Sequence, residues 1–445
     1  MSWRPPERRN PFGTSVVAWR IDSIRAYDDL VALAPAWHAL EVASHIDVPF
    51  QTWEWVTCWW RHLREDSIGI RDSLCVLVVR DDHGELIAIA PLMLTERPAV
   101  GPIRVRFLQF IGADPNMTEV RSVLCPPEHA ERCYAAIREH LARNESGWDW
   151  IEWEGPVGPT NSIRGLSAGL RAAAPKSAYV LPLSSTWQEL RGSLRRNIKE
   201  SLRKCYNSLR REGMAYQLTV VEQRSDLERA LADLFRLHTA RAQLKGTVAH
   251  MDVFESPRAR AFVTEVCAAL AERGIAKIFE LRVDDKLVAS RLAFQMSDTL
   301  YLYYSGWEPA YARFSVMTTL VSEVVQYAIR AQLGAVHLST GGEVSKTRWG
   351  PAEVRYATGV EVSRRRWAQL SHVGYSVAMQ FRHAKLARAL TPAALLRRSG
   401  KSAATPRPSV DDVLVHGLAG PAAAAITLDL IDGVLDRAVH FVAHC

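Results

Sequence analysis

The segments IFELRVDDKLVASRLAFQM (Ile278 to Met296) and LYLYYSGWEP (Leu300 to Pro309) lie close together in the chain and set its architecture. The first contains two runs rich in β-branched and apolar residues around Asp284-Asp285, which predicts an antiparallel hairpin with a tight turn. The second predicts a further strand that ends at a Gly-Trp-Glu-Pro corner. A helix over Val316 to Arg330 and the strand AVHLSTGG, Ala335 to Gly342, are expected to follow.

The same order of elements occurs earlier in the chain. CVLVVRDDHGELIAIAPLML (Cys75 to Leu94) predicts a hairpin, and RFLQFIGADP (Arg106 to Pro115) predicts a strand ending in Gly-Ala-Asp-Pro. A helix over His129 to Leu141 and the strand WDWIEWEG (Trp148 to Gly155) complete the repeat. Coincidence is the alternative, because many α/β proteins place hairpins before helices. The matched Gly-x-acid-Pro corners favour a true repeat.

Length and composition agree with two packed halves. The chain has 445 residues, more than one hydrophobic core usually organises. With 48% hydrophobic and 23% charged residues it is not a disordered chain. Neither GxGxxG nor GxxxxGK[ST] occurs, which argues against dinucleotide-binding and P-loop folds. We expect an α/β (α+β) fold of two similar halves, with mixed sheets flanked by helices.

A basic helix is predicted between the halves, in LRRNIKESLRKCYNSLRREG (Leu194 to Gly213). Its apolar residues recur every three or four positions and lie on one face, and the opposite face carries arginines and lysines. That face is either simply solvated or a clamp for phosphates of a cosubstrate or of RNA.

A capping box, Ser225 to Glu228, predicts the start of a second helix, and Ser256-Pro257 predicts a third.

The sequence therefore divides into four parts: an N-terminal half over 16–190, a basic connecting helix over 191–213, a C-terminal half over 214–362, and a basic helical tail and linker over 363–445. The net charge of +7 is concentrated in the connecting helix and in the acid-free run from Arg364 to Arg407. The tail either packs as a solvated helix or docks on an acidic protein partner or the anionic inner-membrane surface.

The seven cysteines are scattered, with no CxxC pair and no histidine placed to complete a zinc site. We expect them to be reduced and mostly buried, and we expect no metal. No signal peptide or membrane span is recognisable, which predicts a cytoplasmic protein, or one held peripherally at the inner membrane by its tail.

Three segments resemble the FemAB-like acyltransferases of the GNAT superfamily, in particular the CelD-like branch. They are FRLHTAR (Phe235 to Arg241), the stretch from Leu281 to Pro309, and STGGEVSKTRWGP (Ser339 to Pro351). The resemblance covers roughly residues 20 to 365. It differs from the family pattern at Ser315-Val316-Met317, where Ser-Pro-Gly is usual, at Ser345-Lys346, where Tyr-Lys is usual, and at His337, where an acid is frequent.

The resemblance implies an acyltransferase built from two GNAT-like halves. Its cosubstrate would be acetyl-CoA or another acyl-CoA, and its acceptor a small amine or a sugar-linked molecule of exopolysaccharide, cellulose or cell-envelope biosynthesis. Two alternatives stay open. One is a FemAB-like transferase that uses aminoacyl-tRNA, the only case in which we expect a nucleic-acid partner. The other is a non-catalytic accessory subunit of a polysaccharide-synthesis complex.

In such a fold the pyrophosphate of CoA would bind to free amides at the start of the helix after the tyrosine-rich strand. That places the cofactor on Arg313, Ser315, Val316 and Met317. Ser315 could equally be an ordinary helix N-cap.

For catalysis, Glu343 is the candidate base, and its alternative role is an ion pair with Lys346 or Arg348. Lys346 is a further catalytic candidate. Tyr303 and Tyr304 are candidates to protonate the departing thiolate. Because neighbouring strand residues point to opposite faces, we expect only one of the two tyrosines to reach the cleft.

The acceptor site is expected to use His238, Arg241, Arg291 and Trp307. The N-terminal half has no equivalent of the Gly-Gly-Glu stretch, so we expect it to lack a donor site and to shape the acceptor groove. The interpretation requires that the strand around Tyr303 separate from the strand around Leu338.

Overall fold

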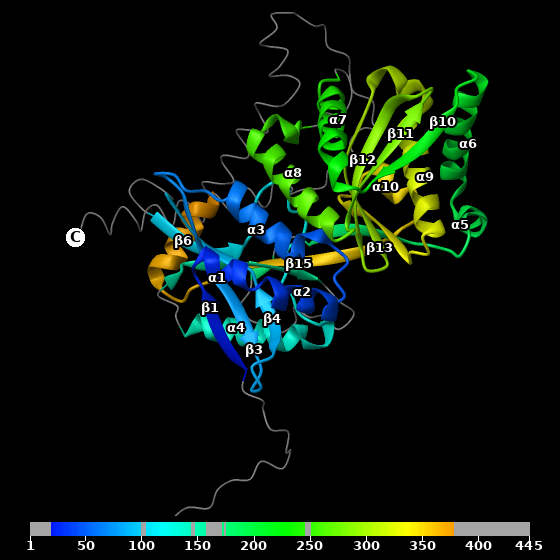
Figure 1. Cartoon of the computed structure of the whole chain (residues 1–445). Helices are drawn as coiled ribbons and strands as arrows, with labels where there is room; N and C mark the ends of the chain where they lie inside the picture. Colours follow the sequence, from blue (N-terminus) through cyan, green and yellow to red (C-terminus); the bar gives the residue numbers. More distant parts are fainter. Residues whose placement is uncertain are drawn as a thin grey trace, which may run out of the picture. The chain divides into compact units, whose positions relative to one another are not determined.

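Figure 1 shows the computed structural model, which describes residues 19–98, 104–143, 147–156, 171–172, 175–244 and 251–377. The chain divides into two compact units, Met1–Met379 and Gln380–Cys445, and the described residues lie in the first. The predicted basic tail continues as a helix over 366–377, and its remainder from residue 378 onward lies outside the described residues. No helix in the described ranges is both long and apolar enough to cross a bilayer.

The C-terminal half is built on a mixed sheet with helices on both faces (Figure 1). Its strands are β10 (Tyr216–Val221), β11 (Ala276–Val283), β12 (Lys286–Met296), β13 (Thr299–Trp307), β14 (Ala335–Thr340) and β15 (Ala352–Val362). Its helices are α6 (Arg196–Arg211), α7 (Arg224–Ala242), η5 (Val253–Glu255), α8 (Pro257–Glu272), η6 (Pro309–Phe314), α9 (Val316–Arg330) and α10 (Val344–Thr347). Apolar residues of α7 and α8 pack against one face of the sheet, and those of α6 and α9 pack against the other.

The N-terminal half repeats the same plan. Its strands are β1 (Arg20–Ile24), β2 (Arg71–Leu74), β3 (Val76–Arg80), β4 (Leu86–Ala90), β5 (Leu92–Pro98), β6 (Arg104–Phe110), β7 (Trp150–Pro156), β8 (Arg171–Ala172) and β9 (Lys176–Pro182). Its helices are α1 (Tyr27–Ala32), α2 (Ala34–Ala43), η1 (Pro49–Gln51), α3 (Trp53–His62), η2 (Pro127–His129), α4 (Ala130–Ala142) and α5 (Trp187–Ser193). The predicted order of hairpin, strand, helix and strand is therefore confirmed in both halves.

One difference between the halves has a simple cause. In the C-terminal half the single strand β12 pairs with β11 on one side and β13 on the other. Its counterpart is broken at Pro91 into β4, which pairs with β3, and β5, which pairs with β6. Proline has no amide proton to donate to a neighbouring strand, so the strand bends there and passes from one sheet to the next.

The two halves share one continuous sheet because each gives a strand to the other. β9, at the end of the N-terminal half, pairs antiparallel with β14 of the C-terminal half. β15 pairs with β9 over Ala352–Tyr356 and with β7 over Tyr356–Val362, so it runs from one half into the other (Figure 1). The predicted division at residues 190 and 213 stays a prediction, since the sheet is continuous across it.

Local signals in the sequence have mixed outcomes. The hairpin turn at Asp284-Asp285 is confirmed, with φ of 47° and 64°. The buried face of α6 is as predicted, and Ser256 caps α8 by accepting from the amide of Ala259. The capping box at Ser225 is wrong: α7 begins at Arg224 after Gln223, because the amide of Asp226 already donates to the Gln223 carbonyl at 3.0 Å.

A buried ion cluster joins the halves beside the aromatic core. Arg273, which ends α8, donates to Glu41 and to Glu54 at 2.7 Å each, and His38 contacts Glu54 at 3.0 Å. His38, Glu41 and Glu54 lie close enough to hold a metal ion, but Arg273 already supplies the positive charge that their carboxylates need. The cluster is therefore a structural link between α2, α3 and α8.

Replacing Arg273 with methionine should lower the free energy of unfolding by about 3 kcal/mol at pH 7, because two buried carboxylates then lose their counter-ion. Burial already raises the pKa of Glu41, and Arg273 opposes that rise. In the variant Glu41 takes up a proton more readily, so the loss should shrink as the pH falls toward 5. Urea denaturation at both pH values measures this.

The matched control is Arg143→Met, which removes an exposed pair with Glu139 and should cost less than about 1 kcal/mol. A loss for Arg273→Met no larger than that of the control would show that the cluster does not hold the halves together.

Candidate active site

The sheet opens between β13 and β14. These parallel strands pair only at Thr299, Leu300 and Tyr301, opposite Ala335, Val336 and His337. β13 continues to Trp307 and β14 to Thr340 without further pairing between them. The separation required by the sequence interpretation is therefore present, and it leaves backbone groups of both strands available to a ligand.

A β-bulge in β13 lies beside this opening. Arg291 of β12 pairs with Ser305, but Ala293 pairs with Leu302, so two residues, Tyr303 and Tyr304, face a single residue of β12. An extra residue shifts the alternation of side chains. Both tyrosines consequently pack on the α7 side of the sheet, and the expectation that they point to opposite faces is wrong.

The hydroxyls of these tyrosines are already used. Tyr303 donates to the carbonyl of Met117, and Tyr304 donates to that of Asn116 at 2.5 Å. Burial raises the pKa of both phenols, so they stay protonated. Their role as acids for a leaving thiolate stays a prediction, and the observed bonds tie β13 to the loop after β6 in the N-terminal half.

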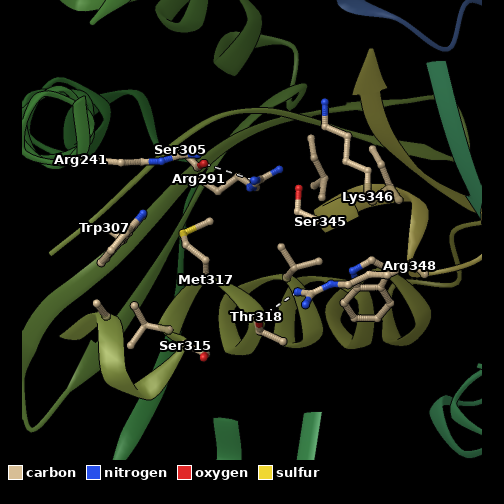
Figure 2. A pocket seen from close by; sticks show the side chains of 16 residues that line it. Arg241, Arg291, Ser305, Trp307, Ser315, Met317, Thr318, Ser345, Lys346 and Arg348 are labelled. Carbon is tan, nitrogen blue, oxygen red and sulfur yellow. Dashed lines mark hydrogen bonds between the residues drawn. The ribbon is translucent and has the colours of Figure 1, made fainter. Parts of the chain in front are cut away.

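The slot cavity fills the opening between β13 and β14 and has a volume of about 260 Å³. Its wall contains Leu302 of β13 and Leu338 of β14, and α9 closes one end (Figure 2). Of the residues predicted to bind the cofactor, the cavity brings together Ser315, Val316 and Met317. Figure 2 shows Met317 pointing into it.

The start of α9 is an unusual helix terminus. Ser315 has the left-handed values φ 54° and ψ 42°, and its side chain caps no amide, so the ordinary N-cap alternative is wrong. The left-handed backbone turns the Ser315 side chain away from the first turn. Within the described residues, the amides of Val316 and Met317 have no hydrogen-bond partner, so the helix presents them to a ligand.

Arg313 lies outside the slot cavity. Its side chain is 67% exposed, stacks on Phe314 with 4.6 Å between the guanidinium carbon and the ring centre, and lies 3.8 Å from Glu212. The prediction that Arg313 binds the cofactor is not tested, but the residue stands beside the cavity rather than in its wall.

A second, larger cavity lies between the two halves and has a volume of about 800 Å³; we call it the inter-half cavity. The loop from Asp114 to Arg121 forms its wall on the N-terminal side, and Tyr303, Tyr304 and Glu343 line the other side. It shares with the slot cavity the residues Arg241, Arg291, Ser305, Ser345 and Lys346. The two cavities therefore meet where β13 and β14 separate.

Lys346 stands at this junction. Its ammonium donates to the Ser339 hydroxyl at 3.2 Å and to the Thr340 carbonyl, and pairs with Glu343 at 3.0 Å. Glu343, whose side chain is 61% exposed, lines the inter-half cavity just before α10. The alternative of an ion pair between Glu343 and Lys346 is thus observed, and it does not remove Glu343 from the cavity.

The predicted acceptor residues are distributed over both cavities. His238 lines the inter-half cavity and contacts the Ser305 carbonyl through Nδ1 at 3.0 Å; since a carbonyl only accepts, Nδ1 is the donor. Arg241 and Arg291 line both cavities, and burial lowers the pKa of each guanidinium. Trp307 lies in the slot cavity, on the side that would hold the donor (Figure 2).

Sequence reasoning missed Glu119. This carboxylate, from the N-terminal half, accepts from the Tyr301 hydroxyl at 2.5 Å, the Ser339 hydroxyl at 3.1 Å and the Thr340 amide at 2.9 Å. It fixes the end of β14 where that strand leaves β13. No local pattern marks it, because its partners lie far away in the sequence; only the repeated Gly-x-acid-Pro corner just before it indicates the place.

The N-terminal half has the corresponding opening, with a smaller cavity of about 180 Å³ between the ends of β6 and β7. β6 and β7 pair only at Phe107 and Leu108 with Trp150 and Ile151. Beyond that point the buried Tyr134 of α4 donates to the carbonyl of Glu154, and the amide of Val123 donates to the Tyr134 hydroxyl. These bonds occupy part of the backbone beside the opening, and the absence of a donor site from this half stays a prediction.

Comparisons with known proteins agree with this geometry. Residues 193–349 match the family described as acetyltransferase (GNAT) domain. No curated protein matches the chain. Among solved structures, FemX is similar with a TM-score of 0.50 and 12% identity, over 79% of this chain and 99% of FemX.

Two further structures are similar at lower TM-scores. The C-terminal domain of a putative lysylphosphatidylglycerol synthetase from Agrobacterium fabrum has a TM-score of 0.45 and 13% identity, over 79% of this chain and 97% of that one. A tandem GNAT protein from the clavulanic acid biosynthesis pathway has a TM-score of 0.41 and 12% identity, over 78% of this chain and 99% of that one. The match lies in the C-terminal half, and the predicted α/β fold of two similar halves, similar to the fold of FemX, is confirmed.

His337 is buried at the point where β14 leaves β13, stacked on Tyr301 with ring centres 4.3 Å apart. Its Nδ1 accepts from the Ser339 amide at 3.0 Å. Burial, followed by the charge of Lys346, lowers the pKa of His337 to about 3. The ring is therefore neutral at every pH at which the fold is expected to function.

Because the unfolded chain protonates His337 near pH 6.5 and the folded protein does not, His337 should lower stability as the pH falls below 6.5. Between pH 7 and 5 the wild-type protein should lose about 2 kcal/mol relative to His337→Gln, which keeps an acceptor for Ser339 but cannot titrate. Urea denaturation of both proteins across this range measures the difference. The exposed His83→Gln is the control, and a pH-independent difference for His337→Gln would contradict the neutral ring.

Proposed function

We propose that the protein transfers an acyl group from an acyl-CoA, such as acetyl-CoA, to an amine or hydroxyl acceptor, because residues 193–349 match the GNAT acetyltransferase domain. The observation that carries this proposal is the junction of two cavities at the separation of β13 and β14. The slot cavity would hold the thioester, and the inter-half cavity would hold the acceptor.

Donor binding would use the backbone more than side chains. The pantetheine arm would pair with the free edges of β13 and β14, as an added strand does in a sheet. The pyrophosphate would sit at the start of α9, where the amides of Val316 and Met317 are free and the helix dipole favours negative charge. No metal is needed for either contact.

The reaction we propose is direct transfer. The acceptor nitrogen or oxygen attacks the thioester carbonyl, the new bond forms, and the carbon–sulfur bond breaks to release the CoA thiolate. Glu343, on the acceptor side, takes the proton of the attacking group. Lys346, at the junction, stabilises the negative charge that develops on the carbonyl oxygen.

The acceptor class is drawn from the shape and lining of the inter-half cavity. Its wall is rich in polar groups such as Asn116, Thr118 and Lys176, which suits a hydrophilic acceptor, including a sugar-linked one. A role in exopolysaccharide, cellulose or cell-envelope biosynthesis is part of this proposal and rests on the family resemblance. Docking of the basic tail on an acidic partner or membrane surface remains a proposal too.

One observation favours a second donor, aminoacyl-tRNA. The outer face of α6 exposes Arg203, Lys204, Arg210 and Arg211, while the inner face packs beneath α9. A run of exposed positive charge is what a phosphate backbone binds. The small volume of the slot cavity fits an extended thioester arm, and we therefore place the acyl-CoA donor first.

Met317→Trp should weaken acetyl-CoA binding at least about tenfold, because the larger side chain projects into the slot cavity where the arm would lie. Isothermal titration of the purified full chain measures it. Val42→Trp, at an exposed position on α2, is the control and should bind as the wild type does. The proposal fails if no short-chain acyl-CoA binds the wild-type protein.

The charge reversal Arg203→Glu with Lys204→Glu separates the two donors. For an acyl-CoA enzyme it should leave acetyl-CoA binding and thiol release unchanged. A protein that binds aminoacyl-tRNA in filter or gel assays, and loses that binding on charge reversal, would establish the alternative donor.

Lys346→Met should lower kcat for thiol release about 100-fold with little change in acetyl-CoA affinity, because the charge acts on the transition state. Hydroxylamine serves as a small general acceptor, and thiol release is followed with a disulfide dye. Lys286→Met, which removes an exposed lysine beside Tyr311, is the control.

Glu343→Gln tests the base in the same assay. As a base, Glu343 should give a rate that rises with pH through its titration, and the glutamine variant should lose that rise. If the variant has the same rate and pH profile as the wild type, Glu343 is not the base and its role is the ion pair with Lys346.

A further inference from the structure

Arg291 is a positive charge held without a counter-ion. It projects from the middle of β12 into the junction of the two cavities (Figure 2). Its guanidinium donates to the Ser305 hydroxyl at 3.2 Å, and its Nε is buried without a hydrogen-bond partner. No carboxylate of the described residues lies within ion-pair distance of it.

Several other partly buried arginines among the described residues are paired with carboxylates. Arg273 contacts Glu41 and Glu54 at 2.7 Å each, Arg121 contacts Glu154 at 2.9 Å, and Arg138 contacts Glu361 at 2.9 Å. Each of these pairs offsets the cost of removing a guanidinium from water. Arg291 shares its lack of an ion pair with Arg348, which lines the slot cavity and donates to the Thr318 hydroxyl at 3.0 Å. Of these two arginines only Arg291 lines both cavities.

The acids that line the inter-half cavity compensate for it only in part, through the charge of Glu119, and none of them forms an ion pair with Arg291. Glu119 is occupied by donors from β13 and β14, and Asp114 accepts from Trp59 at 2.8 Å. Glu343 pairs with Lys346. Arg241 brings a second positive charge toward the same junction. Burial, followed by this repulsion, lowers the pKa of Arg291 to about 10, and Glu119 opposes the shift with a smaller effect. The junction is therefore arranged to receive negative charge.

Resting on the acyl transfer proposed above, we infer that Arg291 binds a carboxylate carried by one of the two reacting molecules, at the junction of the slot and inter-half cavities. The Nε of Arg291 is uncommitted, and its Nη2 keeps a second N–H besides the one given to Ser305, so these two donors can hold both oxygens of a carboxylate. The CoA phosphates are not this anion, since Figure 2 places Arg291 across the cavity from Ser315 and the start of α9.

The position limits where the carboxylate sits in its parent molecule. The junction is also where the thioester carbonyl and the nucleophile would meet, so the carboxylate must lie within a few bonds of one of them. It belongs either to a dicarboxylic acyl group, such as succinyl, or to an acceptor whose amine is close to a carboxylate, as in an amino acid. Both sources present the same chemistry to Arg291.

The first test needs no catalysis. Arg291→Met should raise the melting temperature of the ligand-free protein by about 2 °C or more, because it removes a buried uncompensated charge. Sodium succinate, compared with sodium chloride at equal ionic strength, should raise the melting temperature of the wild type and not that of the variant. Arg236→Met, an exposed and paired arginine of α7, is the control and should respond as the wild type does.

A second variant guards against a folding defect. Arg291→Lys keeps the charge but loses the paired donors, so it should fold and lose most of the response to succinate. A lower melting temperature for Arg291→Met, together with a wild-type response to succinate in both variants, would overturn the inference.

Two further arms identify the molecule that carries the carboxylate. If the acyl donor carries the carboxylate, the wild type should bind succinyl-CoA at least tenfold tighter than acetyl-CoA. Arg291→Met should bind the two thioesters with equal affinity. If the acceptor carries the carboxylate, the wild type should bind the two thioesters equally. Amino acids should then be at least tenfold better acceptors than their amides, and Arg291→Met should lose this preference. The inference would also be overturned if Arg291→Met kept the wild-type preference between the two thioesters and between amino acids and their amides.

The outcome separates this inference from the proposed function. If acetyl-CoA binds but the response to carboxylates does not depend on Arg291, the proposed acyl transfer is supported and the carboxylate site is contradicted. If succinate raises the melting temperature only when Arg291 is present, and no thioester binds, the carboxylate site is supported and the acyl-CoA donor is contradicted.

Discussion

The candidate site depends on backbone hydrogen bonds that β13 and β14 do not make. A parallel pair normally continues along its length, because unpaired amides and carbonyls are costly once buried. Here the pairing stops after Tyr301 and His337, and the bulge at Tyr303 and Tyr304 turns β13 away. Stacking of His337 on Tyr301 closes the paired end, while the other end stays open as the slot cavity. The opening is stable because other contacts hold each strand in place.

Those contacts come largely from the other half of the chain. The hydroxyls of Tyr303 and Tyr304 donate to the loop after β6, and Glu119 from the same loop holds the end of β14. β9 pairs with the outer edge of β14, so that strand cannot move back toward β13 without losing this ladder. The N-terminal half thus acts as a support for the opening and as one wall of the inter-half cavity. A GNAT-like half on its own would lack both.

Much of this architecture follows from local sequence. The two hairpins, the helix from Val316 to Arg330 and the buried face of α6 were predictable because strand alternation and helical spacing are short-range signals. The bulge was not, since one extra residue in β13 is visible only against its partner β12. Glu119 and the exchange of β9 and β15 were missed for the same reason: their meaning depends on residues far away in the chain. The free amides at α9 were predicted in place, but the left-handed Ser315 that exposes them was not.

Comparison of the two halves shows what distinguishes a supporting half from one that can hold a ligand. Both separate their parallel strands after two or three paired residues, so the opening itself is a property of the shared fold. In the N-terminal half a tyrosine from α4 donates to the Glu154 carbonyl of β7, beside a cavity of about 180 Å³. In the C-terminal half no side chain of α9 bonds to the separated strands within the described residues. Two arginines without ion pairs, Arg291 and Arg348, line the space. A hydrogen bond that satisfies the backbone beside the opening stabilises the fold. An arginine without an ion pair costs stability and is expected where a ligand supplies the missing negative charge.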